Sequence, residues 1–234
     1  MPAILDIRAI TKHFGGVTAI SGCSLALEPG RIFSLIGPNG SGKTTLFNLI
    51  TGLERPDDGA VYFKSERIDA VPPHKIALKG IGRTFQIIRV FPEMTALENL
   101  LVVSRMDWEP SRRHALELLG FVKLDRLQGE YAGNLSYGQQ KLLEFARVLM
   151  MDPELILLDE PAAGVNRTLL NDLLEAIRQL RAEGKTILIV EHDMKVVMDL
   201  SEKIFVLDHG EKIAEGPPLA IQHNELVMEA YFGR

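Results

Sequence analysis

Three stretches of the chain are almost entirely apolar, and each stands next to a helical pattern. The apolar runs span residues 31–37, 154–159 and 186–191, and such runs are typical of parallel strands buried on both faces. Residues 43–51 and 168–182 have a helical pattern, and each stretch runs to a glycine that can end a helix. The alternation of strand and helix predicts an α/β fold with a parallel core sheet.

Other strands are expected near the two ends of the chain. Residues 3–10, 18–28 and 60–64 carry β-branched residues or alternating polarity between glycines and prolines, which predicts the strands of an N-terminal antiparallel β lobe. Residues 203–208 predict the last parallel strand, and residues 211–215 turn back from it through a glycine-containing hairpin. A short helix is expected after this hairpin.

A helical pattern dominates residues 88–151. Thr95 and Glu98 have the spacing of a capping box, which predicts a helix start at this point. Ser111 precedes a second helix that should stop near Gly120. The segment therefore predicts an inserted α-helical subdomain.

Length and composition fit one folded domain. The chain has 234 residues, of which 46% are hydrophobic and 24% charged, and these are ordinary values for a globular protein. We expect one domain over residues 1–234, with a core of residues 1–87 and 152–234 around the helical subdomain of residues 88–151. The apolar runs are far shorter than the about 20 residues of a membrane-spanning helix. Because the N-terminus lacks a basic region before an apolar segment, we also expect no signal peptide.

Charge and cysteine content narrow the possible partners. The chain has 26 Lys and Arg against 31 Asp and Glu, for a net charge of −5. An acidic balance lacks the electrostatic footprint of a dedicated nucleic-acid binder, so we expect no nucleic-acid partner. The single cysteine, Cys23, excludes an internal disulfide or cysteine metal cluster and fits a reducing compartment. We expect this cysteine to be buried.

Residues 37–44 read GPNGSGKT and are named here the phosphate loop. They match G-x-x-x-x-G-K-[ST] where a buried strand ends and a helix begins, a context in which backbone N–H groups hold phosphate. Lys43 should reach the β- and γ-phosphates, and the Thr44 hydroxyl should hold Mg²⁺. The residues predicted to contact the nucleotide are Gly37, Asn39, Gly40, Ser41, Gly42, Lys43, Thr44 and Thr45.

Acidic and imidazole groups follow the other two buried runs. Asp159 and Glu160 end one run and His192 follows the next, and the carboxyl ends of parallel strands line the ligand crevice of an α/β sheet. We expect Asp159 to hold Mg²⁺ and Glu160 to act as general base toward the attacking water. His192 should contact the γ-phosphate and orient that water. A strand-end salt bridge and a structural histidine are the alternatives.

Residues 135–139, named here the LSYGQ turn, form a second helix start that suits phosphate. Ser136 and Gln139 have capping-box spacing. The apolar stripe of the following helix comprises Leu142, Ala146 and Leu149. One nucleotide has one triphosphate, so two interpretations stay open: a plain helix cap, or contact with a nucleotide held by another subunit.

Five features together resemble the ATP-binding cassette (ABC) ATPases over almost the whole chain. They are GPNGSGKT, Gln86, LSYGQ, LILLDE and His192. The resemblance implies the P-loop NTPase ABC ATPase fold and a head-to-tail dimer, in which Ser136, Gly138 and Gln139 of one subunit close over ATP on the other. It also implies that Phe14 stacks on adenine and that Gln86 touches Mg²⁺ and water. A packed core side chain and a polar loop residue are the respective alternatives.

Two departures from the general ABC pattern point to one branch of the family. Tyr137 replaces the first glycine of LSGGQ, and AAGVN, ending at Asn166, replaces SALD. With GIGRTFQ and LDHGEKIAEG, these features are similar to the ATPase subunits of branched-chain amino acid importers. The change at Asn166 leaves its hydrogen bonding across the dimer open.

Membership of that branch implies ATP hydrolysis coupled to transport. The chain would be a peripheral subunit on the cytoplasmic face of the inner membrane. Its partners would be transmembrane permease subunits, a second ABC ATPase subunit, identical or different, and indirectly a periplasmic or extracellular substrate-binding protein. Residues 90–94, beside Gln86, are the predicted permease contact, with internal packing as the alternative.

Related ABC ATPases are the alternative functions. Importers of urea or amides and the lipopolysaccharide exporter ATPase also resemble this chain. A soluble ABC ATPase acting on ribosomes or DNA repair complexes is less favoured, because those proteins often carry two cassettes or long inserts. A P-loop kinase or GTPase would not explain the LSYGQ turn.

Overall fold

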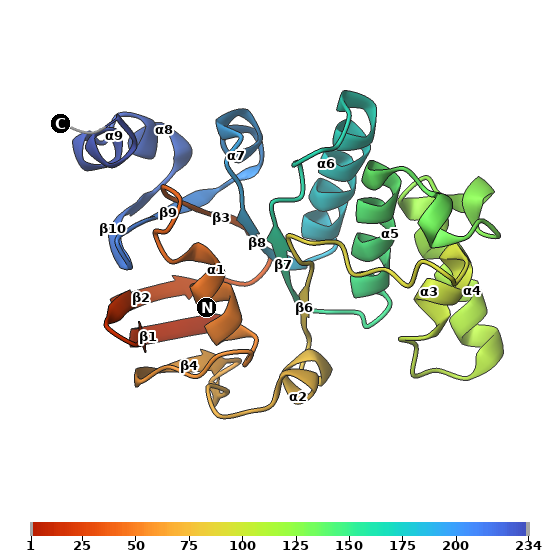
Figure 1. Ribbon diagram of the computed structural model, residues 1–234, viewed down its shortest axis with the longest axis horizontal. Helices are drawn as coiled ribbons and strands as arrows, with labels where there is room; N and C mark the ends of the chain where they lie inside the picture. The colour runs from red at the N-terminus through yellow and green to blue at the C-terminus, as the bar shows by residue number, and fades with distance from the viewer. Residues whose placement is uncertain (1, 233–234) are drawn as a thin grey trace.

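The computed structural model describes residues 2–232, and its centre is a six-stranded sheet (Figure 1). The strand order is β10-β9-β3-β8-β7-β6, in which β10 alone pairs antiparallel. The strands are β3 (Ile32–Ile36), β6 (Ile81–Arg83), β7 (Leu155–Asp159), β8 (Thr186–Val190), β9 (Lys203–Asp208) and β10 (Glu211–Gly216). The predicted parallel core sheet and closing hairpin are confirmed. The sequence pattern did not indicate β6, because three residues with a central glycine are too few to show a period.

A four-stranded antiparallel sheet confirms the predicted N-terminal lobe. Its order is β2-β1-β4-β5, and the strands are β1 (Leu5–Phe14), β2 (Val17–Leu27), β4 (Asp58–Phe63) and β5 (Glu66–Arg67). Strand β2 lies against the phosphate loop: a Cβ at Gly42 would stand 2.6 Å from the Ala19 carbonyl oxygen. Cys23 on this strand is buried as predicted, and burial raises the pKa of its thiol to about 11.

The helices confirm most of the predicted starts. They are α1 (Lys43–Ile50), α2 (Pro73–Leu78), α3 (Ala96–Leu101), α4 (Trp108–Phe121), α5 (Tyr137–Leu149), α6 (Arg167–Ala182), α7 (Met194–Leu200), α8 (Pro218–Gln222) and α9 (Glu225–Phe232), with short 3₁₀ turns at Asp125–Leu127 and Ala132–Asn134. Both predicted capping boxes form, at Thr95 and at Ser136. Two helices, not one, follow the C-terminal hairpin.

The prediction that a helix begins after Ser111 is wrong. Helix α4 begins at Trp108, with Asp107 in the extended N-cap conformation. Pro110 fits within the first turn, where its missing N–H is not needed, so the proline did not delay the start. The Ser111 hydroxyl instead donates to the Met106 carbonyl oxygen at 2.9 Å and thereby ties the first turn to the loop before it.

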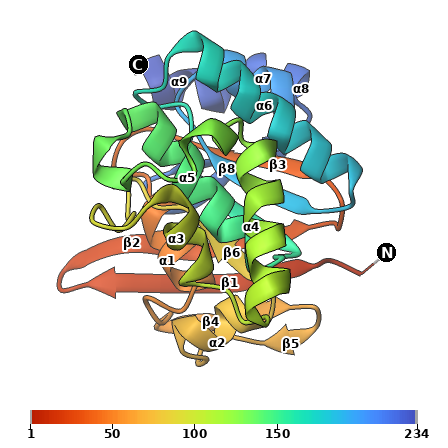
Figure 2. The same cartoon turned by 90° about the vertical axis from the view of Figure 1, so that its right-hand side faces the viewer.

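Alternating residues of the core strands divide the molecule into two layers. Leu155, Leu157 and Leu188 pack with α1 and the antiparallel sheet, whereas Ile156 and Ile187 pack with α5 and α6. Figure 1 shows α1 and the antiparallel sheet on one side of the core strands, and Figure 2, turned by 90° about the vertical axis, shows α3, α4 and α5 toward the viewer. Among residues 2–232, no helix combines the length and apolarity needed to cross a bilayer.

Candidate functional site

The phosphate loop, the ends of β7 and β8 and the start of β2 enclose a cavity of about 280 Å³. Its lining residues are Val17, Thr18, Ala19, Asn39, Gly40, Gly42, Lys43, Thr44, Thr45, Gln86, Glu160 and His192. All except the three β2 residues were predicted from the sequence. Nothing local marks residues 17–19 as site residues, because only the packing of β2 onto the phosphate loop brings them there.

The phosphate loop has the conformation that its glycines predict. Gly40 and Gly42 adopt left-handed backbone angles, with φ of +80° and +104°. A Cβ at Gly40 would have no atom within 4 Å, so this backbone faces open space. At Gly37, where β3 leaves the sheet, a Cβ would collide with the Leu207 carbonyl oxygen, and the glycine is required by packing.

Lys43 folds its side chain back over the phosphate loop. Its Nζ donates to the carbonyl oxygens of Gly37 and Pro38, both at 2.8 Å. Burial lowers the pKa of Lys43, and the negative charges of Glu160 and Asp159 oppose that shift. The ammonium therefore donates to neutral carbonyl oxygens inside the loop. A charged phosphate oxygen is a stronger acceptor and can replace them.

Glu160 lies where the predicted catalytic groups meet. One carboxylate oxygen is 2.7 Å from His192 Nε2, and the other accepts from Gln86 Nε2 at 3.2 Å. The Glu160 backbone is left-handed, with φ of +49°, and its N–H donates to the Val190 carbonyl oxygen at 2.9 Å. The sequence predicted His192 to face phosphate, and the structure adds its contact with the glutamate.

Glu191, which the sequence did not single out, organises the loops around this pair. Its carboxylate is 3% exposed and accepts from the backbone N–H groups of Ala162 at 2.7 Å, His192 at 2.9 Å and Asp193 at 3.2 Å. A buried carboxylate is stable only with such donors. Glu191 thus holds the chain after β7 and the chain after β8 together. The sequence feature that could have pointed to Glu191 is its position at the end of a strand, immediately before His192.

Asp159 lies behind the cavity and does not line it. Its carboxylate is buried and pairs with Arg83 Nη2 at 3.1 Å, and Arg83 Nη1 donates to Asn48 Oδ1 at 2.7 Å. Burial raises the pKa of Asp159, and the Arg83 charge and hydrogen bond act in the opposite direction. The strand-end ion pair considered as an alternative is therefore present at Asp159. It does not involve Glu160, whose oxygens face Gln86 and His192.

Three residues of β1 and the phosphate loop that were predicted to contact the nucleotide, Phe14, Gly37 and Ser41, do not line the cavity. Phe14, at the end of β1, is 45% exposed and does not line the cavity, and Lys12 Nζ lies 5.3 Å from its ring centroid. The alternative of a packed core side chain is thus wrong for Phe14. Ser41 is buried, and its backbone carbonyl accepts from the Gly210 N–H at 3.0 Å. Its contacts support the shape of the phosphate loop.

The LSYGQ turn does not reach the cavity within one chain. The Ser136 hydroxyl accepts from the Gln139 N–H at 3.4 Å, and the Gln139 side chain accepts from the Ser136 N–H at 2.9 Å. Gly138 packs on α6, where a Cβ would lie 2.8 Å from Leu169 Cδ1. Asn166 caps α6, because its Oδ1 accepts from the Leu169 N–H at 3.1 Å. Within one chain this region consists of satisfied helix caps.

The oxygen donors at the cavity fit a hard divalent cation. The Thr44 hydroxyl and the Gln86 amide line the cavity, and the Asp159 carboxylate lies behind them. Gln86 uses its amide nitrogen toward Glu160, so its amide oxygen is available to a cation. Hydroxyl, amide and carboxylate oxygens are the ligands that Mg²⁺ prefers.

Comparisons with known proteins agree with this geometry. The family described as "ABC transporter" matches residues 20–163, and the one described as "Branched-chain amino acid ATP-binding cassette transporter" matches residues 211–234. The chain is 43% identical to the high-affinity branched-chain amino acid transport ATP-binding protein BraF of Pseudomonas aeruginosa, over 98% of both chains.

Solved structures give the same answer. The ADP conformation of an ATP-binding cassette of an ABC transporter has a TM-score of 0.91 and 37% identity, over all of both chains. A dimeric post-hydrolysis cassette bound to ADP and Pi has a TM-score of 0.83 and 30% identity, over 92% of this chain and 98% of that one. The predicted ABC ATPase fold is confirmed, and this chain belongs to the ABC transporter family as an ATP-binding cassette subunit.

Proposed function

We propose that this chain hydrolyses ATP for a membrane transporter that imports branched-chain amino acids. The observation that carries the catalytic part is the Glu160 carboxylate, held between Gln86 and His192 at the cavity of the phosphate loop. The cargo follows from the relatives, since BraF carries that transport function in its name and the C-terminal family match has the same description.

ATP would bind with its phosphates over the phosphate loop. The N–H groups at the start of α1 have no side-chain cap, so they are free for phosphate oxygens. Lys43 would exchange the carbonyls of Gly37 and Pro38 for the β- and γ-phosphates. Val17, Thr18 and Ala19 would line the nucleoside side, and Phe14 would stack on adenine from the neighbouring turn.

Mg²⁺ would be held by the Thr44 hydroxyl and the Gln86 amide oxygen. Asp159 would act through water, because its carboxylate is buried against Arg83 behind the cavity. The bound ion would neutralise charge on the β- and γ-phosphates. The protein would position the oxygen ligands of Thr44 and Gln86 and hold the Glu160 carboxylate in its orientation.

Glu160 is the proposed general base. A water between its carboxylate and the γ-phosphate would give a proton to Glu160 as its oxygen attacks phosphorus and the bond to the β-phosphate oxygen breaks. His192 lies at hydrogen-bond distance from the same carboxylate and borders the cavity, so it can orient that water and contact the γ-phosphate. Glu191 supports this by fixing the His192 backbone.

Transport requires partners beyond this chain. ABC cassettes form dimers, and we infer that Ser136, Gly138 and Gln139 close over ATP on a second cassette, identical or different. Such contacts exist only in the closed dimer, so ATP binding would favour closure and hydrolysis would reverse it. The cassettes would attach to transmembrane permease subunits at the cytoplasmic face of the inner membrane. A substrate-binding protein would deliver cargo on the other face.

Residues 90–94 are the proposed permease contact. Phe91 is 46% exposed, and its backbone N–H and carbonyl are both held by the Asn99 side chain, at 2.8 and 3.0 Å. Val90 packs inward against the helical core, so internal packing accounts for part of the segment. A braced loop with one exposed aromatic ring suits a partner contact. The helical subdomain of residues 88–151 would then transmit its movement to the permease through this contact.

The first test is Glu160→Gln. We expect unchanged ATP affinity and a loss of turnover of about 100-fold or more, since a general base contributes about 10²- to 10⁴-fold. Glu154→Gln is the control, because that carboxylate pairs with Lys64 on the surface. Wild-type turnover in Glu160→Gln would remove the general-base assignment.

The transporter part is tested with the same variant. The Glu160→Gln chain, loaded with ATP, is purified from native membranes and its companions are identified by mass spectrometry. Permease chains are expected, and transport assays with leucine, isoleucine and valine then test the cargo. Ribosomal or DNA repair proteins without a permease would contradict the proposal. Uptake of urea or amides would instead assign the chain to a related importer.

A further inference from the structure

We propose that Lys141 positions Glu160 and so links the helix after the LSYGQ turn to the general base of the same chain. The inference rests on the proposed function of Glu160. Lys141 lies in the second turn of α5 and is 8% exposed. Its Nζ donates to the Glu160 backbone carbonyl oxygen at 2.6 Å. A helix on one side of the catalytic loop thus holds the peptide that follows Glu160.

Glu160 needs such support because its backbone conformation is unfavourable. A non-glycine residue at φ of +49° persists only where its surroundings hold it. The Glu160 N–H donates to the Val190 carbonyl oxygen, and the Glu160 carbonyl oxygen accepts from Lys141 Nζ at 2.6 Å and from the Ala163 N–H at 3.2 Å. Without Lys141, only the longer bond from Ala163, a residue of the same loop, holds this carbonyl. The peptide can then rotate more easily toward an ordinary conformation, and the carboxylate would leave its position between Gln86 and His192.

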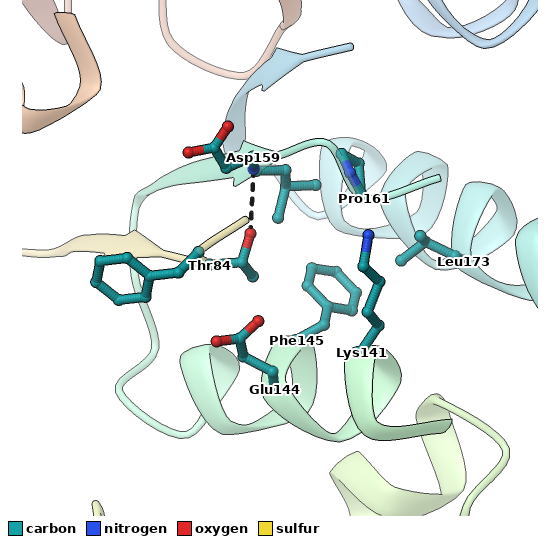
Figure 3. A pocket seen from close by; sticks show the side chains of 9 residues that line it. Thr84, Lys141, Glu144, Phe145, Asp159, Pro161 and Leu173 are labelled. Atoms are coloured by element: carbon teal, nitrogen blue, oxygen red, sulfur yellow. Dashed lines mark hydrogen bonds between the residues drawn. The ribbon is translucent and has the colours of Figure 1, made fainter. Parts of the chain in front are cut away.

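The buried surroundings of Lys141 disfavour a charged ammonium. The hydrogen bond to the Glu160 carbonyl oxygen is therefore the contact that accounts for a lysine at this position. Burial lowers the pKa of Lys141, and Glu191, Glu160 and Glu144 act in the opposite direction. Figure 3 shows the side chain rising from α5 toward Pro161. The adjoining cavity, lined partly by Thr84 and Phe85, measures about 20 Å³. A space of this size holds about one water, so little solvent surrounds the Lys141 ammonium and it depends on protein acceptors.

A second contact joins the same two segments. The Tyr137 ring packs on Gly164, where a Cβ would lie 2.8 Å from Tyr137 Cε1, and Lys141 Nζ lies 5.6 Å from that ring's centroid. Tyr137 and the AAGVN segment containing Gly164 are the two departures from the general family pattern, and here they touch. The first two turns of α5 therefore hold both ends of residues 160–164. A shift of α5 would move Glu160.

The test compares Lys141→Met, which keeps the apolar stem, with Lys141→Arg, which keeps a buried donor. The ATPase rate of the assembled transporter is measured across ATP concentrations, and ATP affinity is measured by calorimetry. We expect Lys141→Met to lower kcat about tenfold or more, because small displacements of a catalytic group cost this much. ATP affinity should stay unchanged, and Lys141→Arg should recover most of the rate. A merely structural lysine would not separate kcat from affinity in this way.

Two results separate this inference from the proposed function. If Glu160→Gln loses turnover while Lys141→Met keeps wild-type kcat, the inference about Lys141 is overturned and the general base stands. If Glu160→Gln keeps turnover, the proposed function fails first. Thermal melting and ATP binding report folding of Lys141→Met. If that variant does not fold, Lys141→Leu, which also lacks a donor, replaces it with the same expected loss of kcat, and wild-type kcat there overturns the inference.

Discussion

The phosphate loop and the LSYGQ turn are both glycine-containing helix starts, but they treat their free N–H groups in opposite ways. Helix α1 starts after Gly42 with no side-chain cap. Helix α5 starts after Ser136 with a complete capping box. An uncapped helix start leaves all of its first N–H groups for an anion, whereas the capping box at Ser136 already occupies one of them, the Gln139 N–H. One helix start is thus open toward the cavity, and the other is capped by its own side chains and lies outside that cavity.

Their surroundings differ in the same sense. The phosphate loop shares a cavity with Gln86, Glu160 and His192, and the LSYGQ turn borders none of it. The two helices also pack on opposite faces of the core sheet (Figure 1). A cassette can therefore bind nucleotide alone, and completing the site over the γ-phosphate would require a second cassette.

The largest expected effect comes from mixing two inactive variants, Lys43→Ala and Ser136→Arg. Each should abolish turnover alone, the first in the phosphate loop and the second in the LSYGQ turn. In an equal mixture half of the dimers are mixed, and each has one intact composite site, so we expect up to about a quarter of wild-type activity. ATPase assays before and after mixing measure this. No recovery would contradict a site shared between two copies of this chain.

The next prediction compares how substitutions in the phosphate loop and in the LSYGQ turn change the ATP affinity of a single chain. Lys43→Ala should weaken ATP binding about 10- to 150-fold, since hydrogen bonds to charged groups contribute about 1.5–3 kcal/mol. Ser136→Ala should leave affinity unchanged, because the turn does not border the cavity. Calorimetric titration gives both values. Lys79→Ala, which breaks a surface pair with Glu66, is the control.

A smaller effect concerns stability of the LSYGQ turn. Gly138→Ala should stabilise the chain less than the same change at an open helix position, because the new methyl group would lie 2.8 Å from Leu169 Cδ1 and the leucine side chain must shift. Gly120→Ala is the matched control within helix α4, where a Cβ meets no atom within 4 Å. That change should stabilise the helix by about 0.5–1 kcal/mol. Urea unfolding compares the two, and equal stability would mean that Gly138 is not closely packed.

The smallest expected effect is a pH dependence of folding stability that arises from Glu144 on α5. Burial raises the pKa of Glu144, and its acceptance of the Arg89 N–H opposes the shift only in part. A carboxyl with a raised pKa in the folded state favours folding below its unfolded pKa, and that advantage is lost as pH rises through the folded pKa. Glu144→Gln should therefore raise the melting temperature at pH 8 and leave it unchanged at pH 4. A gain of the same size at both pH values would exclude this cause.

Local features were predictable from the sequence because they depend on neighbouring residues. The phosphate loop, the apolar strands and both capping boxes each lie within a few consecutive positions, and all of them form. The strand-end rule also brought Glu160 and His192 to the same cavity. The start of α4 was wrong, since Ser111 is one of several polar residues that can precede a helix.

Tertiary structure decided what depends on residues far apart in the chain. Arg83 meets Asp159, Glu191 accepts from Ala162, and Lys141 holds the Glu160 carbonyl. These partners come from different strands and helices, and their charges are stable in the interior only because folding supplies donors or counter-charges. The sequence alone predicted that the phosphate loop, Glu160 and His192 would share one cavity, and they line it. Only the packed structure decided which buried polar side chains hold them in place, because contacts between residues far apart in the chain leave no local sequence pattern.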